Sequence, residues 1–153
     1  MNPLDPRLGD IIRKFVVEEI VPGDIVIAGY PDEEGVSNSG GRSGARLGPE
    51  EIRRVFYKMT PPLEGPLESG IWDAGDLAQL GTLEDRHESA RKLSTEALKK
   101  GACWVGLGGG HDYGFPDGAA FLDTFIEKSG RHRPLIINFD AHLDVRPVDT
   151  EKG

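Results

Sequence analysis

Four short apolar runs are the strongest feature of the hydrophobic pattern, and they cover residues 24–30, 70–72, 102–107 and 135–139. The first, third and fourth runs are almost continuously apolar rather than alternating, which is typical of strands covered on both faces of a parallel sheet. Helical patterns separate most of these runs. Because strands that alternate with helices pair in parallel through crossover connections, the sequence predicts a layered α/β fold.

The first clear helix is predicted to start at Pro49. Proline suits the first helical position, and the carboxylates of Glu50 and Glu51 favour the positive end of the helix dipole. Spacings of three and four residues predict one apolar face for this helix, formed by Ile52, Val55, Phe56 and Met59.

Two further helices are predicted later in the chain. One opens at Thr82, with Asp85 as its capping-box partner, and ends before Gly101. The other covers residues 118–128. Residues 31–48 are rich in Gly and Ser and are expected to form a long loop, of a length that is usually functional or disordered in compact domains.

Composition narrows the class of protein. The 153 residues suit one domain, and 18 basic against 26 acidic residues give a net charge of −8, which argues against binding to nucleic acid or anionic lipid. The single cysteine fits a reducing compartment. No apolar run approaches the roughly 20 residues of a membrane span. We therefore expect a cytoplasmic globular protein that associates neither with membranes nor with nucleic acid.

Candidate chemistry is concentrated after the last apolar run, at Asp140, His142 and Asp144. In an extended chain, residues two apart share a face, so these three side chains are expected to project together. Such a row can bind two metal ions about 3.5–4 Å apart, with one carboxylate shared between them. The alternative interpretation is a polar strand end that leads into a loop.

A second polar group follows the neighbouring run, where Gly108, Gly109 and Gly110 precede His111. Three glycines permit the close backbone approach that would direct His111 into a crevice. A dinucleotide fingerprint fails here because His111 stands where the motif requires its last glycine, and a phosphate-binding loop fails for lack of the Gly-Lys-Ser/Thr ending. His111 alone could equally be a structural or surface histidine.

Together these residues supply two imidazoles and two carboxylates. Such a set suits Mn²⁺, with Zn²⁺, Fe²⁺ or Co²⁺ as competitors. Two ions that share a water lower its pKa and produce hydroxide near neutral pH. The expected chemistry is hydrolysis at a polarised carbon or phosphorus centre.

These motifs resemble those of the ureohydrolase superfamily, which includes arginase, agmatinase and formimidoylglutamase. The likeness rests on GGGHD at residues 108–112, DAHLD at 140–144, the glycine-rich stretch at 35–49 and DAGD at 73–76. Within the superfamily, the Gly-Gly-Arg sequence ending at Arg42 and the segment 138–147 are most similar to formimidoylglutamase.

The resemblance implies a three-layer α/β/α parallel-sheet fold of the arginase type. It also implies that His111 and Asp144 bind one Mn²⁺, that His142 binds the other, and that Asp140 bridges them. The implied reaction converts N-formimidoyl-L-glutamate to L-glutamate and formamide, a step of histidine degradation. Arg146 is a candidate contact for a substrate carboxylate by charge complementarity, although a solvated or structurally paired arginine fits equally.

One departure from the family pattern changes the expectation for this chain. Ureohydrolases carry a third motif, Ser-x-Asp-x-Asp, which completes the metal pair, and no such motif follows Asp144. Four protein ligands are too few for two Mn²⁺ ions with nearly octahedral shells. Residues 1–153 are therefore expected to be the N-terminal part of one ureohydrolase-like domain, incomplete at the C-terminus and inactive alone.

Two alternatives stay open. The substrate could be agmatine or another guanidino compound, or the chain could be a non-catalytic, metal-binding fragment that keeps the fold. The family resemblance implies a homo-oligomer for the complete enzyme.

Two isolated residues, Cys103 and His87, are expected to take no part in the chemistry. Cys103 is predicted to fill space within its strand, and His87 is predicted to be solvated on a polar helix face. Arg42 and Arg46 either line the mouth of the site or belong to a mobile surface loop.

Overall fold

The computed structural model describes residues 5–62, 69–129 and 133–142. Its sheet has four parallel strands in the order β1-β3-β2-β4. The strands are β1 (Arg13–Lys14), β2 (Ile25–Gly29), β3 (Ile71–Asp76) and β4 (Cys103–Leu107). The first three predicted strands are thus confirmed, together with their parallel pairing.

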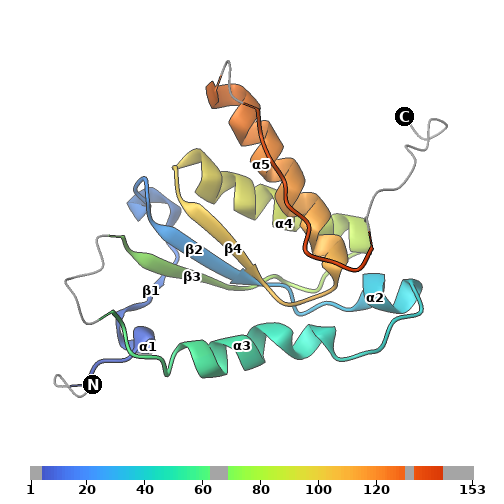
Figure 1. Ribbon diagram of the computed structural model, residues 1–153, viewed down its shortest axis with the longest axis horizontal. Helices are drawn as coiled ribbons and strands as arrows, with labels where there is room; N and C mark the ends of the chain where they lie inside the picture. The colour runs from blue at the N-terminus through green and yellow to red at the C-terminus, as the bar shows by residue number, and fades with distance from the viewer. Residues whose placement is uncertain (1–4, 63–68, 130–132, 143–153) are drawn as a thin grey trace.

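Helices cover both faces of this sheet. Figure 1 shows α4 (Leu83–Lys99) and α5 (Gly114–Ser129) on one side, and α1 (Leu8–Ile11) and α3 (Gly48–Phe56) on the other. The expected three-layer α/β/α arrangement is therefore confirmed. The sequence placed the start of α5 a few residues too late.

Local sequence determines where α4 begins. The Thr82 hydroxyl accepts a hydrogen bond from the Asp85 N–H at 3.2 Å, and the Asp85 carboxylate accepts one from the Thr82 N–H at 2.9 Å. This reciprocal capping box satisfies backbone donors that the helix itself leaves unpaired. The predicted cap is confirmed.

Short helices interrupt the connections between strands. They are η1 (Val17–Glu19), α2 (Glu34–Asn38), η2 (Ala45–Leu47) and η3 (His111–Tyr113). The expectation that residues 31–48 form one long loop is therefore wrong, because α2 and η2 lie within them. Asp32 explains part of the difference, because its Oδ1 accepts the Glu34 N–H at 2.9 Å and organises the start of α2.

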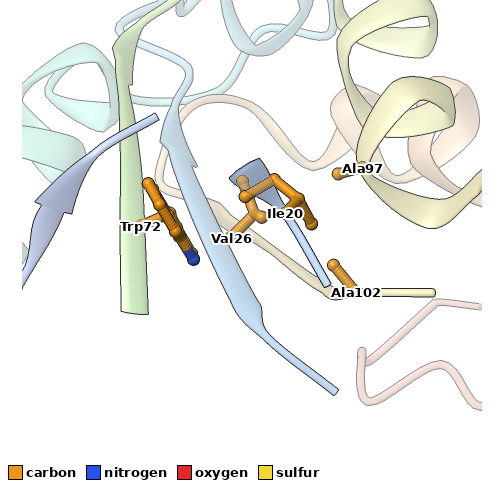
Figure 2. Packing of buried hydrophobic residues seen from close by; sticks show 5 residues of the cluster. All are labelled: Ile20, Val26, Trp72, Ala97 and Ala102. Carbon is orange, nitrogen blue, oxygen red and sulfur yellow. The ribbon is translucent and has the colours of Figure 1, made fainter. Parts of the chain in front are cut away.

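The main core lies between β2, β3 and the helices, and Figure 2 shows its five buried residues: Ile20, Val26, Trp72, Ala97 and Ala102. Asp24 is buried beside this cluster, and its Oδ2 accepts the Trp72 indole N–H at 2.8 Å. Trp72 is thus buried in the core with its indole N–H paired. Cys103, in contrast, is exposed, because β4 is the last strand of the described sheet.

The predicted apolar face of α3 does not face the sheet. Ile52, Val55 and Met59 are exposed, and the helix directs Arg53 inward instead. The Arg53 Nε donates to the Asp73 carboxylate at 2.8 Å, and the same guanidinium donates to the Gly75 carbonyl at 2.9 Å. Ion pairing at the end of β3 therefore outweighs apolar periodicity in orienting α3.

The fourth predicted strand is also wrong: residues 133–139 form no strand in the described part of the chain. Their apolar side chains are exposed, Phe139 to 94%. The segment runs alongside α5 (Figure 1), close enough that a Cβ atom built on Gly118 would lie 3.7 Å from Ile136 Cδ1. A helix bonds its own backbone groups, so it offers this segment no ladder partner.

Candidate metal centre

A glycine turn connects β4 to the first candidate ligand. Gly108 and Gly109 have φ angles of +66° and +77°, which residues with a side chain rarely adopt. A Cβ atom on Gly109 would lie 2.5 Å from the Tyr30 carbonyl oxygen. The Gly110 N–H then donates to the Asp32 carbonyl at 3.1 Å. The glycines thus let the turn lie directly against the end of β2, as the sequence predicted for a turn that positions His111.

His111 begins η3, and Tyr113 anchors the other end of this short helix. The ring of Tyr113 stacks on Tyr30 with centroids 4.4 Å apart. Its hydroxyl donates to the buried carboxylate of Asp32 at 2.7 Å. His111 therefore projects from a segment whose end is fixed to the core, while its own side chain is half exposed.

Asp32 forms the charged centre of this support. Arg86, from α4, donates from Nε to Asp32 Oδ2 at 2.7 Å, and both side chains are more than nine-tenths buried. Burial raises the pKa of Asp32, but hydrogen bonds from the Glu34 N–H, Tyr113 and Arg86 outweigh it and hold the pKa below its ordinary value. Asp32 thus stays ionised as it joins α4, η3 and the end of β2.

His87 is not the solvated helix residue that the sequence predicted. Its Nε2 lies 2.6 Å from Asp112 Oδ2, and the two side chains are only 17% and 24% exposed. Because an ionised carboxylate can only accept, the imidazole N–H is the donor. The contact joins α4 to the residue directly after His111.

Asp140 meets His111 although the intervening segment forms no strand. The Asp140 Oδ2 atom lies 3.3 Å from His111 Nδ1, and its Oδ1 lies 2.9 Å from His142 Nδ1. The His142 N–H also donates to Oδ1, at 2.7 Å. This backbone hydrogen bond, followed by the His142 ring, lowers the pKa of Asp140, so the carboxylate is ionised between two imidazoles.

Three of the five predicted site residues therefore come together: His111, Asp140 and His142. Asp144 and Arg146 lie outside the described residues. The three meet at a turn and not along one face of a strand. Of the two loop arginines, Arg46 pairs with Glu33 at 3.3 Å.

The donor set fits a shared carboxylate better than a single closed ion site. Each oxygen of Asp140 faces a different imidazole, which is the arrangement that a carboxylate between two ions requires. Within residues 5–62, 69–129 and 133–142, no three His, Cys, Asp or Glu side chains surround one point as the ligands of a single ion would. Carboxylate oxygen and imidazole nitrogen together suit Mn²⁺.

A cavity of about 380 Å³ adjoins His111. Tyr30, Asp117 and the glycine turn form much of its wall. The Asp117 Oδ1 accepts the Tyr30 hydroxyl at 2.6 Å and the Trp104 indole N–H at 3.0 Å, and burial raises the pKa of this carboxyl. Sequence reasoning missed Asp117, as it missed Asp32 and Arg86, because their partners are far away in the chain.

Comparison with known proteins places the chain in a family. The model of the arginase family matches residues 23–153. The chain belongs to the arginase family. The resemblance found in the sequence motifs is thereby confirmed.

Among arginase-family proteins, the chain is similar to formimidoylglutamases. It is 38% identical over 136 residues to the formimidoylglutamase of Klebsiella pneumoniae (strain 342), and the match covers 88% of this chain and 40% of that relative. The crystal structure of Trypanosoma cruzi formiminoglutamase with Mn²⁺ superposes with a TM-score of 0.76 at 36% identity, covering 96% of this chain and 48% of that one. The chain thus spans less than half the length of these relatives.

More distant structures share the fold. The formimidoylglutamase of Bacillus subtilis is 18% identical and superposes with a TM-score of 0.66 over 81% of this chain.

In the described ranges, no helix combines the length and the apolar character that crossing a bilayer requires.

Proposed function

We propose that this chain belongs to a binuclear manganese hydrolase that cleaves N-formimidoyl-L-glutamate to L-glutamate and formamide, a step of histidine degradation. The observation that carries the proposal is the contact of Asp140 with both His111 and His142, at 3.3 and 2.9 Å. Family membership and the likeness to formimidoylglutamases support it. The solved relative from Trypanosoma cruzi is described with Mn²⁺.

Each residue has a distinct role in this proposal. His111 and Asp144 would hold one ion and His142 the other, and Asp140 would be shared between them. Two ions held there would supply a nucleophilic water, because they would lower its pKa toward neutrality. Arg146 binds a carboxylate of the substrate through charge-assisted hydrogen bonds.

The same proposal makes the 153-residue chain inactive by itself. Four side chains cannot fill two nearly octahedral Mn²⁺ shells, so further ligands must come from elsewhere. We also propose that the complete enzyme is a cytoplasmic homo-oligomer. Purified chain dialysed against Mn²⁺ should yield no glutamate or formamide from the substrate. Turnover comparable with that of the Klebsiella pneumoniae relative would contradict this part of the proposal.

The activity itself is tested in a chimera. Residues 23–153 of this chain replace the matching segment of the Klebsiella pneumoniae formimidoylglutamase, and the product is assayed with formimidoylglutamate, agmatine and arginine. Hydrolysis of formimidoylglutamate that Asp140→Asn abolishes supports the proposal. Preference for agmatine would assign a cationic substrate instead, because anionic and cationic substrates require opposite charges in the pocket.

A non-catalytic fragment is the second candidate, and the observation that favours it is the lack of three ligands around one point in the described residues. Metal analysis separates the two candidates. Two Mn²⁺ ions per folded chimera support the hydrolase, whereas zero or one supports the fragment.

A further inference from the structure

We propose that His87 is a positioning residue for His111. Through Asp112 and Tyr113, the two residues that follow His111, it keeps the His111 imidazole directed toward Asp140. This inference rests on the proposed function, because it gives a purpose to the orientation of His111.

His87 contacts both residues at once. Its Nε2 lies 2.6 Å from Asp112 Oδ2. The same imidazole ring meets Tyr113 edge-on, with centroids 4.9 Å apart and planes at 81°. His87 thus contacts both of the η3 residues that follow His111.

The Asp112 carboxylate has little freedom to move away from His87. A Cβ atom on Gly110 would lie 2.1 Å from Asp112 Oδ1, and one on Gly35 would lie 2.4 Å from Asp112 Cγ. The carboxylate therefore lies in the space between the glycine turn and α2. Because this space would not hold even one added methyl group, a displacement of the Asp112 carboxylate is transmitted to the backbone on either side.

Helix η3 cannot fix His111 by its own backbone bonds. It spans only three residues, and its backbone bonds run from the Tyr113 N–H to the Gly110 carbonyl at 3.2 Å and from the Gly114 N–H to the His111 and Asp112 carbonyls, so none of them restrains the His111 ring. The support must therefore come from neighbouring elements. Helix α4 is suited to provide it, since it is long and capped at Thr82.

A structural contact of this kind could instead serve stability alone, and three variants separate the two roles. His87→Ala removes both contacts. His87→Gln is the conservative variant, because its side-chain amide can donate from a position close to that of Nε2. Arg91→Ala, from the same helix, is the matched control, since Arg91 pairs with Asp123 at an exposed site away from η3.

The first readout is the Mn²⁺ affinity of the folded chimera described above, measured by electron paramagnetic resonance. His87→Ala should weaken binding about tenfold, as expected for residues that orient a ligand. His87→Gln should restore most of the affinity, and Arg91→Ala should leave it unchanged. Equal affinity in wild type and His87→Ala would overturn the proposal.

The second readout needs no metal. The ¹⁵N shift of His111 Nδ1 reports its contact with Asp140, and it should move toward the free-imidazole value in His87→Ala and return in His87→Gln. A chimera that binds no Mn²⁺ would refute the proposed function, and the shift would still decide the role of His87. An unchanged shift in His87→Ala would overturn the positioning role, even if the proposed function holds.

Discussion

Arg86 and Asp32 form a buried ion pair with 2.7 Å between Nε and Oδ2, and the same Asp32 oxygen accepts the Tyr113 hydroxyl at 2.7 Å. One carboxylate therefore joins α4 to the helix that carries His111. The candidate site depends on this support, because the side chain of His111 itself is half exposed.

Removing one member of this ion pair should destabilise the fold. Arg86→Met leaves the Asp32 carboxylate buried without its cation, and we expect the free energy of unfolding to fall by about 3–5 kcal/mol. Urea unfolding followed by tryptophan fluorescence measures the change. Arg54→Ala is the control, because Arg54 pairs with Glu51 at an exposed site, and it should cost less than about 1 kcal/mol. Equal effects of the two variants would refute the supporting role.

The glycine turn should tolerate no side chain at Gly109. Its φ of +77° is unfavourable for alanine, and the added Cβ would lie 2.5 Å from the Tyr30 carbonyl oxygen. We expect Gly109→Ala to lower the free energy of unfolding by about 3 kcal/mol or more.

Gly40 provides a matched control for that substitution. It has a similar φ of +72°, but an added Cβ would meet nothing within 4 Å. Gly40→Ala should therefore cost only the backbone strain, about 1–2 kcal/mol. If both variants unfold at the same urea concentration, the close approach at Gly109 is not a constraint.

Acid should destabilise the fold partly through Asp24. Burial raises the pKa of this carboxyl, but hydrogen bonds from the Val21 and Gly70 N–H groups and from Trp72 outweigh it, so the folded-state pKa is lowered. A lowered pKa stabilises the fold above the unfolded value of about 3.9, and that contribution is lost as the pH falls through the folded-state pKa. The free energy of unfolding should therefore decline below about pH 5.

Asp24→Asn tests this assignment. The variant should have a lower free energy of unfolding than wild type at pH 7. Because the amide of Asn does not titrate, the free energy of unfolding of the variant should depend less on pH in acid. Urea titrations between about pH 7 and pH 2 measure both slopes. Identical slopes for wild type and variant would contradict the role of Asp24.

Local patterns predicted much of the fold. The apolar runs at β2 and β4 and the Thr82 cap of α4 are determined by nearby residues, and the structure agrees with them. The orientation of α3 was missed because Arg53 is held by carboxylates of β3, and no spacing within the helix indicates such partners. Residues 135–139 have the composition of a strand, but they lie along α5, which offers no ladder partner.

The candidate site was predictable in part. The spacing of two residues indicated Asp140 and His142, and the three glycines indicated His111, because each motif is continuous in sequence. The contacts that support them are not continuous. His87 and Asp112 are joined only by the packing of α4 against η3, so a single sequence gives no sign of their hydrogen bond.

The central claim, that His111 and Asp140 act together as metal ligands, is tested most directly by a double-mutant cycle on Mn²⁺ affinity. The four proteins are wild type, His111→Ala, Asp140→Asn and the double variant, each titrated with Mn²⁺ by isothermal calorimetry after circular dichroism has verified folding. We predict that each single variant weakens binding about tenfold or more, and that the double variant is little weaker than either. Affinities that match wild type in both single variants would contradict the claim.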